Sequence, residues 1–229
     1  MYKRQVRKLP FDTRRHFAGI SMTYNAAYLL VVPPALGVKT VQDLIALAKA
    51  KPGQLNYASG GTGTTTHLGP ELFKMATGVN IVHVPYKGTG QALTDVISGQ
   101  VQMMMSSALP AIPHLKAGRL RGLGVTSAKR AAAYPELPTL AEAGVPGFET
   151  TSWHGMLVPA KTPRAIGQRV HTELVKALTS SDVKEKFAGL GMEVVANRPE
   201  EFTAYIRSEN VKWTKVIKTI GLKPESVTP

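Results

Sequence analysis

The chain alternates between short apolar runs and longer stretches in which apolar residues recur every three or four positions. Short apolar runs are typical of buried β-strands, whereas the longer spacing is typical of amphipathic α-helices. Strands are predicted at residues 29–32, 55–58, 81–84, 101–105, 120–126, 150–158 and 193–195. Helices are predicted at residues 41–50, 67–75, 91–97, 139–143, 162–178, 182–190 and 199–219. This alternation predicts an α/β fold.

Local signals mark the ends of several predicted helices. Thr40 and Asp43 have the spacing of a capping box, and Lys-Pro-Gly at residues 51–53 ends the helix that they begin. Pro163 opens a long helix with one apolar face, formed by Ile166, Val170, Leu174 and Ala177. The order of elements in the first half is β-α-β-α-β, which predicts a parallel sheet with crossover helices. The C-terminal helices bring few strands of their own, so we expect them to cover a sheet whose strands lie elsewhere.

Residues 56–68, Asn-Tyr-Ala-Ser-Gly-Gly-Thr-Gly-Thr-Thr-Thr-His-Leu, are the most informative part of the chain. Such a passage from strand to helix directs backbone N–H groups and hydroxyls toward an anion at the positive end of the helix dipole. It matches neither a Walker loop nor a dinucleotide-binding loop, because no Gly-Lys-Ser/Thr follows and Thr66 replaces the third glycine. Glycines and hydroxyls can also serve only to turn the chain and cap a helix. With a second strand-to-loop passage at residues 83–88, the pattern predicts a cleft for a carboxylate or a phosphate.

The composition is that of a folded chain with a substantial core, since 43% of the 229 residues are hydrophobic and 19% are charged. The length suits one large domain or two small ones. Basic residues give a net charge of +13 but are scattered over many predicted helices, so we expect attraction of small acids and no nucleic-acid partner. Residues 1–8 are basic, yet no apolar segment follows them, so they are not a signal peptide. Either the protein is cytoplasmic or sequence before residue 1 is missing.

The residues that could carry chemistry form no familiar catalytic or metal-binding pattern. The chain has no cysteine, its six histidines lack zinc-site spacing, and it has no Gly-x-Ser-x-Gly elbow. A pairing of Ser59 with His67, or of Ser106 with His154, stays open, but nothing in the sequence selects either pair. We therefore predict a binding protein with no catalytic residue, no metal site and no cofactor.

Two apolar features need interpretation beside these polar ones. The three methionines at residues 103–105 are expected in the core of a strand. Trp153 follows an apolar segment and could either wall a ligand pocket or pack in the core.

Several motifs resemble one known family. They are Tyr57-Ala58-Ser59 with the glycine loop and His67-Leu68, the segments 83–88, 92–95 and 99–101, and the segments 123–130, 138–147 and 151–153. In register from about Leu9 to near the C-terminus, they resemble the Bug family, the extracytoplasmic substrate-binding proteins of tripartite tricarboxylate transporters.

This resemblance implies a periplasmic-binding-protein-like α/β fold of type II, a flytrap with two lobes. It implies a monomeric, non-enzymatic periplasmic protein that captures a small organic acid, such as a di- or tricarboxylate or an aromatic carboxylate, and delivers it to a membrane permease. The ligand-binding residues carried over by position are Ser59, Gly60, Thr62, Gly63 and Thr64 in the anion loop, and Trp153 and His154 near the crossing between lobes. The domains implied are a non-family tail at 1–8, a residual segment of lobe 1 at 9–29, the complete lobe 2 at 30–150, and the C-terminal part of lobe 1 at 151–229.

The chain also departs from the family pattern. The family usually has Asn at the position of Thr62 and often Asp at that of Ser106, so a plain carboxylic acid is expected to bind better than an amino acid. The family's signal peptide, first strand and Pro/Gly-rich loop are absent before Leu9. We therefore expect a truncated chain that binds ligand weakly and aggregates through exposed apolar helix faces. Two other functions stay open: a ligand-sensing effector domain, and an enzyme that uses the glycine loop as an anion hole.

Overall fold

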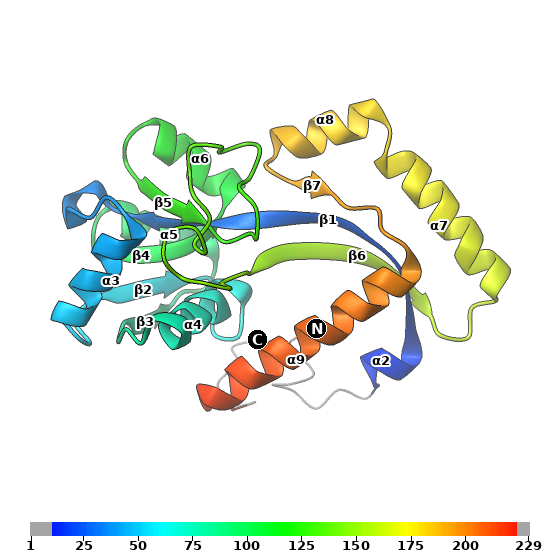
Figure 1. Cartoon of the computed structure of the whole chain (residues 1–229), viewed down its shortest axis with the longest axis horizontal. Coiled ribbons are helices and arrows are strands. Elements are labelled where there is room, and N and C mark those ends of the chain that lie inside the picture. Colours follow the sequence, from blue (N-terminus) through cyan, green and yellow to red (C-terminus); the bar gives the residue numbers. More distant parts are fainter. Residues whose placement is uncertain (1–10, 224–229) are drawn as a thin grey trace. The chain divides into compact units, whose positions relative to one another are not determined.

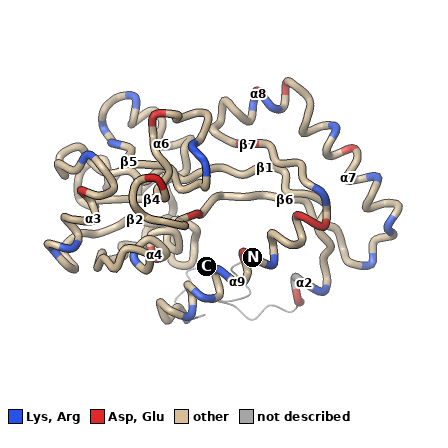
Figure 2. Tube along the Cα trace, viewed as in Figure 1, with Lys and Arg blue, Asp and Glu red and all other residues tan. Residues whose placement is uncertain are grey.

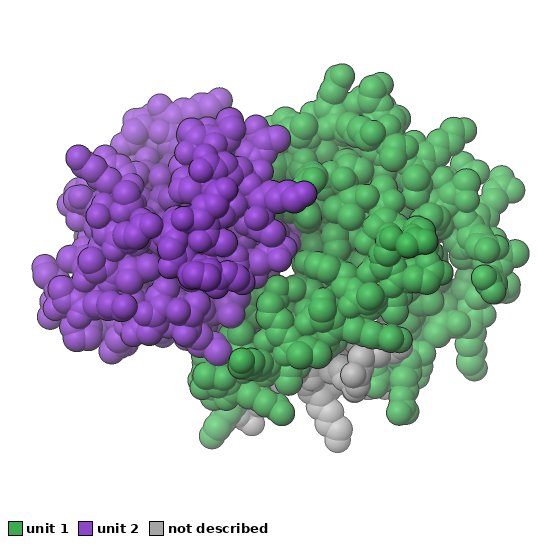
Figure 3. Space-filling model, viewed as in Figure 1, with its two compact units in different colours: residues 1–26, 153–226 green, residues 27–152, 227–229 purple. Residues whose placement is uncertain are grey.

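The structure, a computed structural model, describes residues 11–223. Within that range the chain forms two compact units (Figure 3). Unit 1 contains residues 11–26 and 153–223, and unit 2 contains residues 27–152. The chain passes from one unit to the other within strand β1 (Phe17–Val32) and again within β6 (Thr151–Pro159). The predicted lobes at 9–29, 30–150 and 151–229 stay predictions, and the predicted tail at 1–8 lies outside the described residues.

Unit 2 is built on a mixed β-sheet with the strand order β3-β2-β4-β1-β5 (Figure 1). Its strands besides β1 are β2 (Asn56–Ser59), β3 (Val82–Pro85), β4 (Met103–Ser107) and β5 (Arg121–Val125). β2 is parallel to β3 and β4, as the β-α-β pattern predicts. β1 is antiparallel to both β4 and β5, so the prediction of a purely parallel sheet was wrong. The reason is that β1 enters this sheet from unit 1, with no crossover helix before it.

β1 is also much longer than predicted. The apolar run at residues 29–32 is only the end of a 16-residue strand. Ser21, Thr23 and Asn25 interrupt the apolar pattern in its first half, where Tyr24 and Asn25 pair with Val194 and Glu193 of β7 (Glu193–Val194). A pattern based on continuous apolar residues therefore detects the half in the core of unit 2 and misses the rest.

Helices cover both faces of the unit 2 sheet. They are η1 (Pro34–Leu36), α3 (Val41–Ala50), α4 (Thr65–Thr77), α5 (Thr89–Ile97) and α6 (Ala108–Lys116). Alternate residues of a strand point to opposite faces. Accordingly, Met103 and Met105 pack in the core that contains Leu44 of α3 and Phe73 of α4, whereas Met104 packs in the core formed with α5 and α6. The expectation that residues 103–105 form strand core is confirmed.

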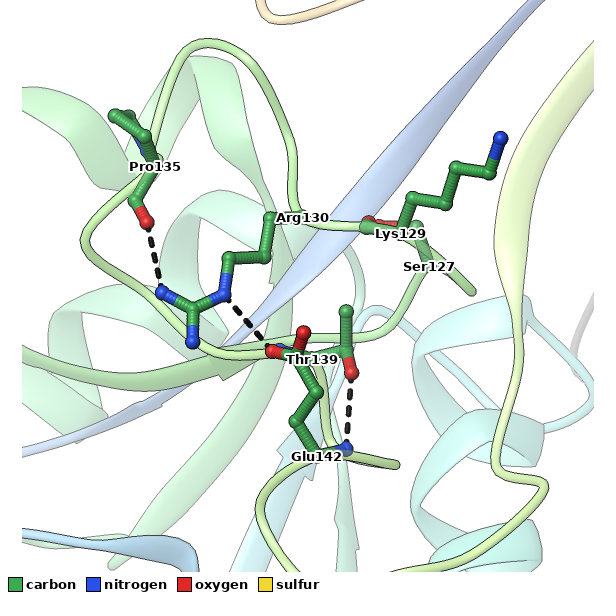
Figure 4. A network of polar contacts seen from close by, with 6 residues as sticks. All are labelled: Ser127, Lys129, Arg130, Pro135, Thr139 and Glu142. Atoms are coloured by element: carbon green, nitrogen blue, oxygen red, sulfur yellow. Dashed lines mark hydrogen bonds and ion pairs between the residues drawn. The ribbon is translucent and has the colours of Figure 1, made fainter.

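Residues 139–143 form a capped turn rather than the predicted helix. The N–H of Thr139 donates to Glu142 Oε2 at 3.0 Å, and the N–H of Glu142 donates back to Thr139 Oγ1 at 3.0 Å (Figure 4). Arg130 also donates to Glu142 Oε2, at 2.9 Å, and to the carbonyl oxygen of Pro135. The cap is present, but Gly144 has a φ of +94° and stops the turn before a helix can form.

Unit 1 consists of the first half of β1, most of β6, strand β7, and the helices α2 (Thr13–His16), α7 (Arg164–Leu178), α8 (Ser181–Gly189) and α9 (Pro199–Thr219). Helix α9 buries Phe202, Trp213, Val216 and Ile217. The predicted apolar face of α7 is not buried within the described chain, because Ile166 is 52% exposed and Val170 and Leu174 are half-buried. Across residues 11–223, no helix combines the length and the apolar character that a bilayer crossing requires. Lys and Arg lie on many separate elements rather than along one stripe (Figure 2).

Candidate functional site

The loop between β2 and α4 uses most of its own backbone donors to hold its shape. The N–H of Gly60 donates to Thr66 Oγ1 at 2.9 Å, and the N–H of Gly61 donates to Ser59 Oγ at 3.2 Å. The N–H of Gly63 donates to His67 Nδ1 at 3.0 Å. Gly60, Gly61 and Gly63 therefore shape the loop, and their N–H groups are already occupied by side chains of unit 2.

Three other N–H groups of this loop remain available. Those of Thr62, Thr65 and Thr66 have no acceptor among residues 11–223. Thr65 and Thr66 are the first two residues of α4, and the N-terminal N–H groups of a helix have no partner within the helix itself. The N-cap Thr64 does not bond them, because its hydroxyl donates to the carbonyl oxygen of Gly61 at 2.7 Å. These donors lie at the positive end of the α4 dipole and suit an anion.

Two glycines explain why the loop can adopt this shape. Gly63 has a φ of +79°, in the left-handed region that side chains disfavour. A Cβ at Gly60 would lie 2.9 Å from Thr89 Cγ2 and 3.2 Å from the backbone nitrogen of Thr89. The glycine at position 60 thus lets the loop pack directly against the start of α5.

Two histidines stack behind the loop. The rings of His67 on α4 and His83 on β3 are 4.0 Å apart and nearly parallel, and the ring of Tyr57 lies 4.9 Å from His83. His83 Nε2 is 2.6 Å from Ser59 Oγ, and Tyr57 donates to Glu71 Oε1 at 2.6 Å. Ser59 therefore pairs with His83, a partner that the sequence did not single out.

Burial keeps both imidazoles neutral near pH 7. Removal from water lowers the pKa of His83 to about 3, with the nearby His67 and Lys74 adding to the effect. Burial also lowers the pKa of His67, although Glu71 acts in the opposite direction. Lys74 is itself paired with Glu71 at 2.8 Å. With both imidazoles neutral and Lys74 paired, the features of this loop that suit an anion are its backbone N–H groups and the dipole of α4.

The sequence profile of the family described as tripartite tricarboxylate transporter family receptor, TctC, matches residues 2–222. The chain belongs to this family. The match begins before Leu9, where the motif resemblance started, and the expected membership in the Bug family of tripartite tricarboxylate receptors is confirmed. Family members of this kind are receptors that bind substrates.

A protein from Pseudomonas sp. strain P51, named for the tcbD-tcbE intergenic region, is 36% identical over 211 residues. The alignment covers 92% of this chain, and the chain spans 63% of the length of that relative. Two solved structures have similar folds. Rpa4515 of R. palustris with adipate has a TM-score of 0.82 at 37% identity, and covers 94% of this chain and 72% of its own. MatC of Rhodopseudomonas palustris with bound malate has a TM-score of 0.78 at 25% identity. The alignment covers 94% of this chain and 75% of the MatC chain. The predicted α/β fold of a periplasmic solute-binding protein is confirmed.

The structure of this TctC receptor distributes the predicted ligand residues over both units. Ser59, Gly60, Thr62, Gly63 and Thr64 share the loop of unit 2, where Ser59 is fully buried. Trp153 and His154 belong to unit 1. The indole N–H of Trp153 donates to Glu209 at 3.1 Å, and the exposed ring of His154 stacks on Tyr24 at 4.7 Å. Their roles in binding stay predictions.

The predicted ligand-binding residues did not include Thr65, Thr66 or His83, although the motifs at residues 56–68 and 83–88 contain them. The signal for the two threonines was present, because a loop that leads into a helix leaves the first N–H groups of that helix free. No local signal links His83 to Ser59, since they lie 24 residues apart and meet only when β2 and β3 pair. Within residues 11–223, no group of three or more His, Asp or Glu residues is arranged to hold a metal ion.

Proposed function

We propose that this receptor captures a small organic carboxylate for a tripartite tricarboxylate transporter. The observation that carries the proposal is a set of three N–H groups without an acceptor among residues 11–223: those of Thr65 and Thr66 at the N-terminus of α4, and that of Thr62 in the loop before it. A carboxylate has two oxygens that accept such hydrogen bonds, and it carries the charge that the helix dipole favours. Two solved relatives support this ligand class, because one structure is with adipate and the other has bound malate, which are both dicarboxylates.

The remaining parts of this function follow from the family resemblance. The protein acts as a monomer in the periplasm, and it passes its ligand to a membrane permease. A plain acid is preferred to an amino acid, because the family's frequent Asp is replaced by Ser106, a fully buried residue whose hydroxyl bonds the carbonyl oxygen of Ser107. Succinate should therefore bind more tightly than aspartate, which differs from it by one amino group.

A pair of variants at Thr65 tests the binding role of the backbone. Thr65 is the first residue of α4, where proline is well tolerated, and Thr64 before it has an extended backbone that proline permits. Thr65→Pro removes the N–H and the side chain, whereas Thr65→Ala keeps the N–H and removes only the hydroxyl that accepts from Tyr28. A hydrogen bond to a charged group contributes about 1.5–3 kcal/mol, so we expect Thr65→Pro to weaken adipate binding about tenfold or more.

Isothermal titration calorimetry with adipate and malate gives the comparison directly. The proposal predicts that Thr65→Ala binds nearly as tightly as the unmodified protein and that Thr65→Pro does not. Equal affinities for the two variants, at equal thermal stability, would show that this N–H does not hold the ligand.

The enzyme alternative gains little from the contact between Ser59 and His83. Ser59 and His83 are 2.6 Å apart, but the Ser59 side chain is fully buried and its oxygen already accepts from Gly61. A nucleophile must reach its substrate, and this hydroxyl instead connects the loop to β3. No contact in the described chain favours the effector-domain alternative.

A further inference from the structure

The loop that carries the proposed anion donors is held in place by two hydrogen-bond acceptors that are both histidines. His67 Nδ1 accepts from the N–H of Gly63 at 3.0 Å. His83 Nε2 is bonded to Ser59 Oγ, which in turn accepts from the N–H of Gly61. We propose that His67 and His83 are positioning residues, whose neutral imidazoles fix Gly63 and Gly61 and so aim the N–H of Thr62, which lies between these two glycines. This inference rests on the proposed function of the loop.

The hydrogen bonds determine the tautomer of His67. A backbone N–H is only a donor, so the Nδ1 atom that faces Gly63 must carry a lone pair. The proton of the neutral ring is therefore on Nε2. Protonation of His67 would place a hydrogen on Nδ1, opposite the N–H of Gly63, and the bond would be lost.

The tautomer of His83 follows from Ser59. The hydroxyl oxygen of Ser59 accepts from Gly61, and its hydrogen needs an acceptor because the side chain is fully buried. His83 Nε2 is the acceptor available among the described residues, at 2.6 Å. The bonds thus run from Gly61 through Ser59 to His83, which leaves the proton of this ring on Nδ1.

The surroundings of the two rings oppose a positive charge on either. The rings stack at 4.0 Å, so a proton on one disfavours a proton on the other. The charged and titratable groups that face them are Tyr57 on β2 and Glu71 and Lys74 on α4. Glu71, which also contacts Tyr57 and Lys74, raises the pKa of His67, but burial lowers that pKa more. Since the pKa of His83 is about 3, this ring stays neutral at pH 5, and an effect of mild acid on the loop must come from a proton on His67.

Paired variants separate positioning from simple packing. An asparagine side chain places its oxygen near the Nδ1 position of histidine, and a glutamine side chain places it near Nε2. His67→Asn therefore keeps an acceptor for Gly63, and His67→Gln does not. His83→Gln keeps an acceptor for Ser59, and His83→Asn does not. His114→Asn on α6, which has no hydrogen bond to the loop among the described residues, is the control.

The experiment combines nitrogen-15 NMR of the imidazoles with amide hydrogen exchange and adipate titration, from pH 7.5 to pH 5. We expect the Nε2-protonated tautomer for His67 and the Nδ1-protonated tautomer for His83. Exchange at Gly63 should be about tenfold faster in His67→Gln than in His67→Asn, the loss expected from one hydrogen bond. Adipate affinity should fall with acid in the unmodified protein and in His114→Asn, but less in His67→Asn.

The opposite tautomers, or equal exchange at Gly63 in His67→Asn and His67→Gln, would overturn the positioning role. Failure of the proposed function has a different signature. If neither the unmodified protein nor any variant binds adipate while the tautomers and exchange rates are as expected, the histidines still position the loop, and the ligand class is wrong.

Discussion

Glu209 shows how completely a buried polar residue of this protein is satisfied. Its side chain lies in unit 1, where the indole N–H groups of Trp153 and Trp213 donate to Oε2 at 3.1 and 2.9 Å. Lys212 forms an ion pair with Oε1. The family resemblance implied that Trp153 binds ligand, whereas its position after an apolar segment left a pocket wall and core packing both open. Its polar edge is instead committed to Glu209, and only its ring faces remain for packing or for a ligand.

Replacing Glu209 with alanine should destabilise unit 1 by about 3 kcal/mol, because two indole donors and a lysine would lose their buried partner. Glu209→Gln keeps an acceptor and should cost less. Both tryptophans of the chain belong to unit 1, so their fluorescence during urea unfolding follows this unit specifically. A Glu209→Ala midpoint equal to that of the unmodified protein would contradict this role.

His83 makes the stability of unit 2 sensitive to acid. Its pKa of about 3 in the folded state lies below the ordinary value of about 6.5, so the unfolded chain binds a proton more readily between these values. The stability that the neutral ring contributes is therefore complete above pH 6.5 and declines as the pH falls toward 3.

His83→Gln should reduce this acid dependence, because glutamine does not titrate and can still accept from Ser59. The measurement is the change in urea midpoint between pH 7.5 and pH 4.5 in both proteins. The amide NMR resonances of unit 2 report its unfolding. The carboxylates that titrate in the same pH range are common to both proteins, so their contributions to the change in midpoint cancel in the comparison. A His83→Gln protein that loses as much stability as the unmodified one would refute the assignment.

Helices with clear end signals were predictable, and strands with polar interruptions were not. Thr40 and Asp43 form the predicted capping box, and α9 has the predicted bounds. β1 was found only at residues 29–32, because the pairing of its first half with β7 depends on residues about 170 positions away. The turn at 139–143 has a helix cap but no helix. Local patterns fix capping, whereas long-range pairing fixes the extent and direction of strands.

The contact between β6 and α9 gives a direct test of how two elements pack together. A Cβ at Gly155 of β6 would lie 2.2 Å from Phe202 Cζ, and Phe202 is buried in α9. Gly155→Ala should therefore destabilise unit 1 by about 3 kcal/mol, at the upper end of the cost of overpacking. Tryptophan fluorescence in urea measures the change. The double variant Gly155→Ala with Phe202→Leu should recover part of it, and no recovery would mean that the clash is not the cause.

For the whole protein, the sequence predicted the α/β class and the family, but it located the anion donors only approximately. The predicted loop is present, yet Gly60 and Gly63 use their N–H groups to hold it. The donors that find no acceptor within residues 11–223 are those of Thr62, Thr65 and Thr66. The start of a helix predicts unpaired N–H groups at Thr65 and Thr66, but no pattern of residue types shows that those of Gly60 and Gly63 are occupied, because their acceptors Thr66 and His67 reach back from the helix. Only the folded geometry makes that distinction.

The central claim is that a carboxylate binds to these three N–H groups, and an NMR titration tests it most directly. Adipate is added to nitrogen-15-labelled protein, with its neutral dimethyl ester as the matched control. We predict saturable downfield shifts of the Thr62, Thr65 and Thr66 amide protons with adipate and none with the ester. Saturable shifts confined to other residues, or the same shifts with the ester, would contradict a carboxylate site at the start of α4.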